Sequence, residues 1–259
     1  MDIDMNICVV FVCNKAYFNK FIYTCNQLLT NGKYNGNICL VIGDDLLNDE
    51  LLNSDIIIKN KIIIKHFFDI KFTNEFLNIQ NSMVRPPHWF KKLFQFHKFH
   101  LFNTFFKQWN YIFYLDCGIS IFSDIFPIIN EITENTENTL LAHSDAYPSY
   151  EWKLYNQFDK NNKEYFIKLN NTYNLHIDYF QTTIMLYDTK IIKNDTYDNL
   201  LNLLKEYPIS ITNDQGIIAL YFTNIEPLFK QIKTNNENTY FYDYLSRNKD
   251  NKYIMLKLN

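Results

Sequence analysis

Residues 111–125 read YIFYLDCGISIFSDI, and the order of apolar residues and acid in this stretch indicates the fold class. Its first five residues are aromatic or aliphatic without interruption, as expected for a strand that is covered on both faces. Asp116 follows directly, and an unpaired carboxylate at the end of a buried strand is unfavourable unless it is paired or holds a cation. The segment alone leaves two interpretations open. Asp116 begins a turn that Gly118 relaxes, or it is a ligand for a metal or a sugar phosphate.

The residues N-terminal to this stretch alternate between strand and helix patterns. ICVVFVC (7–13) and NICLVIGD (37–44) predict strands, and an apolar helical face recurs between them over residues 19–29. The β-branched segment 55–67 predicts one or two further strands, and residues 87–108 predict a long helix. This alternation implies right-handed parallel units, which bind ligands beyond the carboxyl ends of their strands.

The residues C-terminal to the stretch continue the alternation. LLAHSD (140–145) and YFQTTIMLYDTK (179–190) predict strands. Residues 196–207 predict a helix, and residues 213–222 predict another that begins at Asn213 or Asp214. The chain has no internal repeat and no linker long enough to require two domains, so its 259 residues suit one large α/β domain.

The composition excludes several classes of protein. Hydrophobic residues make up 47% of the chain and aromatic residues 17%, which is far from the composition of a disordered chain. A net charge of −3 and only two arginines argue against a nucleic-acid-binding surface. The five cysteines form no C-x-x-C pair, so we expect buried free thiols in a reducing compartment. The first apolar run is too short for a signal peptide or a membrane span, and we therefore expect a cytoplasmic protein.

Common catalytic and nucleotide-binding motifs do not occur. The chain has no G-x-S-x-G, G-x-G-x-x-G or P-loop, and five glycines leave little room for a cradle of backbone amides around phosphate. A bound nucleotide would therefore be held by side chains and a cation. His97 and His100 lack an accompanying H-E-x-x-H glutamate, which favours packed or surface histidines over a metal pair. The acids form no recognisable couple of the kind that glycoside hydrolases use.

Four short segments at the predicted strand and helix ends carry a stronger signal together than apart. In chain order they are CNKAY (13–17), KFH (98–100) followed by DCG (116–118), FQTT (180–183) and DQG (214–216). This series resembles the GT-A glycosyltransferases of the glycogenin and galactinol synthase group, a retaining family that uses nucleotide-sugar donors. The corresponding family motifs are T-N-D-A-Y, K-L-H, D-x-D, F-N-S/A-G and D-Q-G. The resemblance spans roughly residues 5–230.

The resemblance implies a fold and a function. The implied fold is an α/β GT-A domain over residues 1–234, with a central mixed, mostly parallel sheet flanked by helices, and a C-terminal tail over residues 235–259 packed on it. The implied function is transfer of a hexose from a UDP-sugar to an acceptor hydroxyl on a glycan or a protein, with retention of configuration expected. A homodimer and self-glucosylation on one of the 19 tyrosines are further options that no motif decides.

The first two segments imply contacts to the nucleotide. Cys13, Asn14 and Tyr17 stand in the T-N-D-A-Y position and would hold the uridine. Lys98 would contact the donor phosphates, and Asp116 would hold the cation or the ribose.

The last two segments imply contacts to the donor sugar. Gln181 and Asp214 would face the sugar, and Gln215 would assist them. Arg85 matches no family motif, but it is one of only two arginines and stands beside two prolines. It is either a further phosphate contact or a surface residue.

Two departures from the family pattern concern the metal. Gly118 replaces the second acid of D-x-D, and the family's C-terminal H-x-x-G-x-x-K-P-W is absent. The Mn²⁺ or Mg²⁺ that the family uses would therefore be held weakly by Asp116, a diphosphate and water. Three alternatives stay open: another acid completes the metal site, Lys98 or Arg85 neutralises the charge, or catalysis is lost.

Two rival functions accompany the transferase hypothesis. Loss of catalysis would leave a GT-A protein that binds a nucleotide-sugar without turning it over. An interaction module without sugar chemistry is the other, and it rests on the aromatic, asparagine-rich composition.

Overall fold

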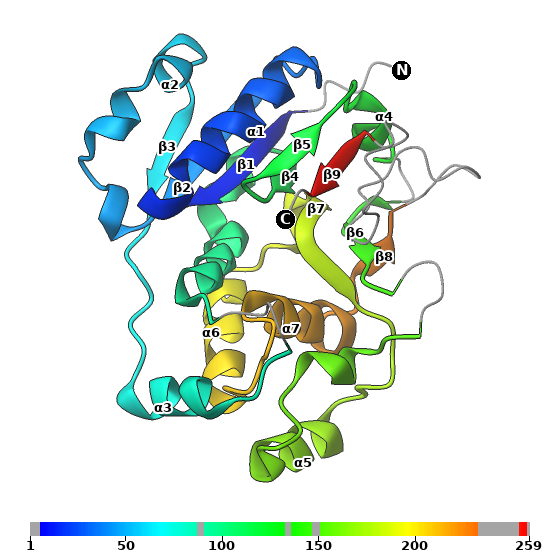
Figure 1. Ribbon diagram of the computed structural model, residues 1–259. Coiled ribbons are helices and arrows are strands. Elements are labelled where there is room, and N and C mark those ends of the chain that lie inside the picture. The colour runs from blue at the N-terminus through cyan, green and yellow to red at the C-terminus, as the bar shows by residue number, and fades with distance from the viewer. Residues whose placement is uncertain (1–5, 87–90, 133–135, 147–150, 233–253, 258–259) are drawn as a thin grey trace.

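The computed structural model describes residues 6–86, 91–132, 136–146, 151–232 and 254–257. Its centre is a seven-stranded sheet in the order β3-β2-β1-β4-β7-β6-β8 (Figure 1). The strands are β1 (Ile7–Cys13), β2 (Asn37–Ile42), β3 (Ile63–His66), β4 (Tyr111–Leu115), β6 (Leu140–Ser144), β7 (Phe180–Asp188) and β8 (Phe229–Gln231). In this sheet β7 alone runs antiparallel to its neighbours, so the predicted mixed, mostly parallel sheet is confirmed.

The strand directions bring several predicted segments to one edge of the sheet. β1 and β4 are parallel, with Val10 level with Tyr114, so their carboxyl ends lie side by side. β7 runs the opposite way, and its first residues therefore reach the same edge, where the amide of Asp116 donates to the carbonyl of Thr183 at 2.9 Å. β6 also ends there, because Ser144 pairs with Phe180. We call this edge the carboxyl edge.

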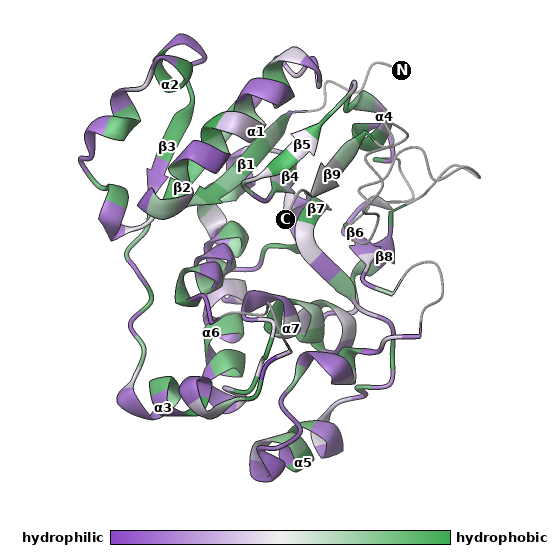
Figure 2. Ribbon diagram, viewed as in Figure 1, coloured by the Kyte–Doolittle hydropathy of each residue, from purple (hydrophilic) through white to green (hydrophobic). Residues whose placement is uncertain are grey.

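Both faces of the sheet are buried, as the apolar run at residue 111 predicts. Alternate residues of β1 belong to two separate hydrophobic clusters, with Val10 in one and Phe11 in the other. Figure 2 shows hydrophobic colouring along β1 and β2, whereas α1 carries both kinds of residue. α1 (Phe18–Thr30) buries Phe21 and Leu28 in the same cluster as Phe11, because these residues recur at helical spacing.

The other cluster is covered by helices from the second half of the chain. The helices besides α1 are α2 (Asp55–Lys59), α3 (Asn74–Ser82), α4 (Phe126–Ile129), α5 (Lys163–Thr172), α6 (Thr196–Glu206) and α7 (Asp214–Leu220). α6 and α7 contribute Leu200 and Ile217 to the cluster that contains Val10. No helix in the described ranges has the length and apolar character needed to cross a membrane.

Two sequence-based predictions of secondary structure are wrong in part. Residues 55–67 contain a strand only in β3, since α2 precedes it with Asp55 and Lys59 paired across one turn at 2.7 Å. The long helix over 87–108 is two 3₁₀ helices, η4 (Leu93–Phe102) and η5 (Thr104–Gln108), and residues 87–90 lie outside the described ranges.

The break between η4 and η5 has a local and a tertiary cause. Asn103 is extended and its side chain accepts a hydrogen bond from the amide of Phe105, which starts a new helix. All residues from Phe96 to Phe102 are buried, so packing on every side replaces the one-sided pattern of a surface α-helix.

The described part of the C-terminal tail adds a strand. β9 (Met255–Lys257) pairs antiparallel with β5 (Ile119–Ile121), directly after Gly118. Most of the tail, residues 235–253 and 258–259, lies outside the described ranges, so the division of the chain at residue 234 stays a prediction.

Candidate functional site

Lys98 lies at the centre of the carboxyl edge, between two acids. Its side chain is buried, and its Nζ is 2.9 Å from Asp116 Oδ1 and 3.3 Å from Asp214 Oδ2. It also donates to the carbonyl of Thr182 at 3.4 Å. η4 supplies the lysine, while the acids follow β4 and begin α7. We call Lys98, Asp116, Thr182 and Asp214 the Lys98 cluster.

Within the Lys98 cluster, the ammonium of Lys98 is a charged group inside the protein. Burial alone would lower the pKa of the Lys98 ammonium, but the two carboxylates outweigh it and hold that pKa above its usual value. Burial raises the pKa of Asp214, although Lys98 and the hydroxyl of Thr182, which donates to Oδ2 at 2.6 Å, favour its charged form. Tyr114 donates its hydroxyl to Asp116 Oδ1 at 2.5 Å. Lys98 therefore stays charged at neutral pH.

Asp145 is a second buried acid at this edge, and the sequence-based site prediction missed it. It directly follows β6 and is only 7% exposed. Gln181 donates to its Oδ1 at 2.5 Å, while Tyr179 and Gln215 donate to its Oδ2. The signal that could have found it is the pattern LLAHSD, which, like YIFYLD, places an acid directly after a buried strand.

Asp145 links the two predicted glutamines. Gln215 accepts from the amide of Thr182 at 3.3 Å and donates to Gln157 Oε1 at 2.9 Å. Gln181 is 3% exposed, and its Oε1 has no hydrogen-bond partner within the described part of the chain. Buried polar atoms are nearly always paired, so this oxygen is available to a ligand hydroxyl.

The predicted uridine-binding residues follow β1 at the same edge. Cys13 is buried and its thiol donates to the carbonyl of Asn14 at 3.1 Å. Asn14 Oδ1 is also buried, without a partner among the described residues. Tyr17 ends the short helix η1 (Lys15–Tyr17), half-buried, with the ammonium groups of Lys20 and Lys92 5.0 and 5.5 Å from its ring centroid.

Arg85 lies in a different environment from the Lys98 cluster. Its guanidinium donates to the carbonyl of Ile211 at 3.2 Å and to Gln80 at 2.8 and 2.6 Å. These bonds tie the end of α3 to the loop before α7, which is a structural role. A phosphate contact by Arg85 stays a prediction.

The two histidines are packed side chains. His97 Nε2 lies 3.2 Å from the carbonyl of Ile42, and His100 is stacked on Phe67 and Tyr197 at 4.4 and 4.5 Å between ring centroids. Burial lowers the pKa of His100 to about 3, so its ring is neutral.

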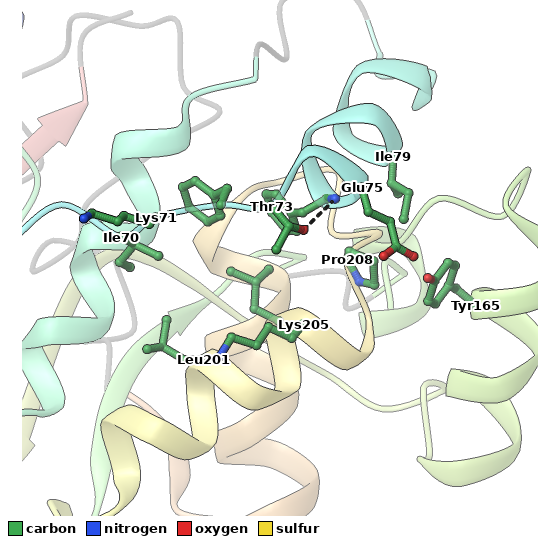
Figure 3. A pocket seen from close by; sticks show the side chains of 12 residues that line it. Ile70, Lys71, Thr73, Glu75, Ile79, Tyr165, Leu201, Lys205 and Pro208 are labelled. Carbon is green, nitrogen blue, oxygen red and sulfur yellow. Dashed lines mark hydrogen bonds between the residues drawn. The ribbon is translucent and has the colours of Figure 1, made fainter.

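An apolar groove of about 280 Å³ lies between α3 and α6 (Figure 3). Ile79, Tyr165 and Leu201 are among its lining residues. The groove shares no residue with the Lys98 cluster, so it is not part of the candidate site.

Several solved structures of glycosyltransferases share this arrangement of elements. The galactosyltransferase LgtC, in complex with donor and acceptor sugar analogues, superposes with a TM-score of 0.56 at 13% identity over 94% of this chain and 80% of its own. Mouse xyloside xylosyltransferase 1 gives a TM-score of 0.53 at 13% identity, over 93% and 88%. Core-mannan synthase A from Aspergillus fumigatus, in a Mn/GDP form, gives 0.55 at 12% identity, over 88% and 73%.

The chain has a GT-A glycosyltransferase fold. No family model matches its sequence, and no curated protein matches it either. The chain spans less than half of two further glycosyltransferases that it matches, 39% of the bifunctional glycosyltransferase WbbM and 46% of GlyE from Streptococcus pneumoniae TIGR4. The GT-A fold predicted from the four segments is thus confirmed across most of the chain, whereas identities this low carry no statement about donor or acceptor.

The side chains around Asp116 in this GT-A chain do not form a set of ligands that fits a divalent cation. Asp116 Oδ1 already accepts from Lys98 and Tyr114, and Gly118 offers no side chain. The described ranges contain no group of three or more His, Cys, Asp or Glu residues placed to hold a metal ion. Mn²⁺ and Mg²⁺ prefer several oxygen ligands. The Mn²⁺ or Mg²⁺ that the resemblance implies therefore finds no matching set of ligands here.

Replacement of Asp145 by asparagine is expected to change how stability depends on pH. Burial raises the pKa of Asp145, so the folded state binds the proton more tightly than the unfolded state. Its contribution to stability therefore falls as pH rises from about 4 through the raised pKa, by about 1.4 kcal/mol per pKa unit. Asp145→Asn should remove this decline, as measured by urea denaturation of both proteins from pH 4 to 8.

Asp55, an acid whose pKa is lowered rather than raised, is the control for this experiment. A hydrogen bond from Lys59 lowers the pKa of the exposed Asp55, so Asp55→Asn should shift the pH profile weakly in the opposite direction. Parallel profiles for wild type and Asp145→Asn would contradict the assignment of Asp145 as a raised, buried acid.

Proposed function

We propose that the chain is a glycosyltransferase that moves a hexose from a UDP-sugar to an acceptor hydroxyl. The observation that carries the proposal is the Lys98 cluster at the carboxyl edge of a GT-A sheet, where open α/β sheets bind their ligands. Two unpartnered buried acceptors, Asn14 Oδ1 and Gln181 Oε1, stand at the same edge and are suited to a ligand's donors.

Most of the predicted residues have a role in this proposal. Asn14 and Tyr17 hold the uracil, and Cys13 shapes the floor beneath them. Lys98 faces the diphosphate and Asp116 the ribose. The residues that face the hexose are Asp145, Gln181, Asp214 and Gln215, of which Asp145 comes from the structure alone.

The chemistry requires a stabilised leaving group and a protected anomeric carbon. The bond between the anomeric carbon and the diphosphate oxygen breaks, with the electron pair leaving on the diphosphate. The acceptor oxygen forms the new bond and its proton passes to the departing diphosphate or to solvent. A buried ammonium such as that of Lys98 stabilises the developing negative charge more strongly than a solvated one. The buried side chains around Asp145 and Gln181 would keep water from the anomeric carbon.

A nucleotide-sugar-binding protein without turnover is the second candidate. Gly118 favours it, because the residue that supplies a metal ligand in the family is missing. The two candidates share the donor site and differ only in whether UDP is released.

A donor screen tests the proposal. UDP-glucose or UDP-galactose at about 100 times its dissociation constant should raise the melting temperature by roughly 5–10 °C, while ATP and GDP-mannose should not. Release of UDP with an acceptor or water would support the transferase, and a shift without release would support the binder. No shift with any nucleotide would contradict both and favour an interaction module.

The proposal also includes an acceptor for the sugar. The acceptor is a hydroxyl on a glycan or protein, and stepwise hexose additions in the intact mass after incubation with UDP-glucose would identify the chain itself as acceptor. A cytoplasmic location and a homodimer stay predictions from the sequence.

A further inference from the structure

The backbone conformation of Gly118 and the side chain of Lys20 next to it both disfavour an acidic side chain at position 118. Its φ of +93° is a conformation that residues with a Cβ rarely adopt. A Cβ at this position would lie 3.3 Å from Cδ of Lys20. The stem of Lys20 therefore covers the position from which the second acid of a D-x-D motif would project. A lysine stands where the family places a metal-binding carboxylate.

Lys20 and Lys92 form a pair of cations without carboxylate partners. Both ammonium groups lie within 5.5 Å of the centroid of the Tyr17 ring. Neither forms a salt bridge with any residue in the described ranges. Several exposed lysines pair with acids, namely Lys15, Lys33, Lys59, Lys168, Lys190 and Lys193, whereas Lys20 and Lys92 belong with the exposed lysines that do not. Two unpaired cations beside one ring, at the rim of a site that already contains Lys98, are suited to an anion.

We propose that Lys20, Lys92 and Lys98 hold the donor diphosphate in place of a divalent cation, so that nucleoside diphosphate binding is independent of metal. This inference rests on the proposed donor site. Lys98 is buried at the carboxyl edge, whereas Lys20 and Lys92 are exposed and lie beside the ring of Tyr17. Their charges supply the neutralisation that a metal ion supplies when two acids of D-x-D are present.

The charges of the Lys98 cluster explain why Lys20 and Lys92 are needed in addition to Lys98. Lys98 alone is balanced by Asp116 and Asp214, so the buried cluster has no excess positive charge to offer a diphosphate. Lys20 and Lys92 restore a net positive charge at the rim. Both are exposed and can move toward a phosphate without breaking an ion pair.

Calorimetric titration of the full chain with UDP tests the proposal. The dissociation constant measured in EDTA should equal that measured with Mn²⁺ within about twofold. A gain of more than tenfold with Mn²⁺ would overturn metal independence and leave the proposed donor site standing. Absence of UDP binding under both conditions would overturn the proposed function and this inference with it.

Lysine variants separate the phosphate contacts from the base contacts. Lys20→Met and Lys92→Met should each weaken UDP binding by about tenfold, which corresponds to about 1.4 kcal/mol, and should leave uridine binding unchanged. Lys160→Met is the matched control, because Lys160 is also an exposed lysine over a tyrosine ring, with its ammonium 3.3 Å from the ring centroid of Tyr155, and it forms no salt bridge with the described residues. It should change neither affinity. Equal losses for UDP and uridine, or no loss for UDP, would overturn the proposal.

Discussion

Replacement of Lys98 by methionine is expected to lower the free energy of unfolding by about 3–5 kcal/mol. Methionine fills a similar volume but leaves the carboxylates of Asp116 and Asp214 close together, in a buried site without a counter-charge. Urea denaturation at pH 7 measures the loss. The deficit should shrink as the pH is lowered toward 4, because the unpaired acids then bind protons in the folded state.

A double variant shows whether the loss comes from charge. Lys98→Met combined with Asp214→Asn removes one negative charge together with the positive one, so it should be more stable than Lys98→Met alone. Lys168→Met, at an exposed ion pair, should change stability by less than about 1 kcal/mol. If Lys98→Met also lowered the free energy of unfolding by less than about 1 kcal/mol, Lys98 would not be a buried counter-ion.

Replacement of Asp214 by asparagine is expected to lower sugar transfer, or donor hydrolysis, by about 10²- to 10³-fold. The variant keeps the shape of the side chain but removes its negative charge. In the wild type this carboxylate lies 3.3 Å from the Lys98 ammonium and accepts a hydrogen bond from Thr182. UDP affinity should change by less than about tenfold, because Asp214 is proposed to face the hexose and Lys98 keeps Asp116 as its partner. Turnover of the UDP-sugar that the screen identifies measures the first effect, and calorimetry the second.

Asp188 provides a matched control away from the site. It is as buried as Asp214, but it ends β7 at the edge opposite the carboxyl edge, where it accepts from the amide of Lys190. Asp188→Asn should lower stability without lowering turnover per folded molecule. If Asp214→Asn and Asp116→Asn both left turnover at the wild-type level, the assignment of the Lys98 cluster to the donor site would be wrong.

Most strands of the central sheet, and the edge at which they end, could be predicted because these signals are local; the short β8 was not predicted. The uninterrupted apolar run before Asp116 reports a strand buried on both faces, and β4 is covered by both clusters. Alternation of strands and helices implies parallel strands, whose carboxyl ends must share an edge. CNKAY and DCG are therefore neighbours in space, as their order predicts.

Other features depend on contacts that no short window contains. Residues 55–59 are β-branched and still form a helix, and η4 is not the long α-helix predicted, because it is buried on every side. Asp145 carries no motif that separates it from any other acid after a strand. It becomes a site residue only because Tyr179, Gln181 and Gln215 converge on it.

The sequence by itself determined six strands of the central sheet, their common edge and the order of the four segments, since side-chain periodicity and chain direction dictate these. It also showed that Gly118 lacks the second acid of D-x-D. Only the tertiary structure decided what replaces that acid. The packing of η4 against β4 and α7 places the ammonium of Lys98 between Asp116 and Asp214, and α1 lays Lys20 over Gly118. Neutralisation of a charge depends on distance in space, and these residues meet only when the chain has folded.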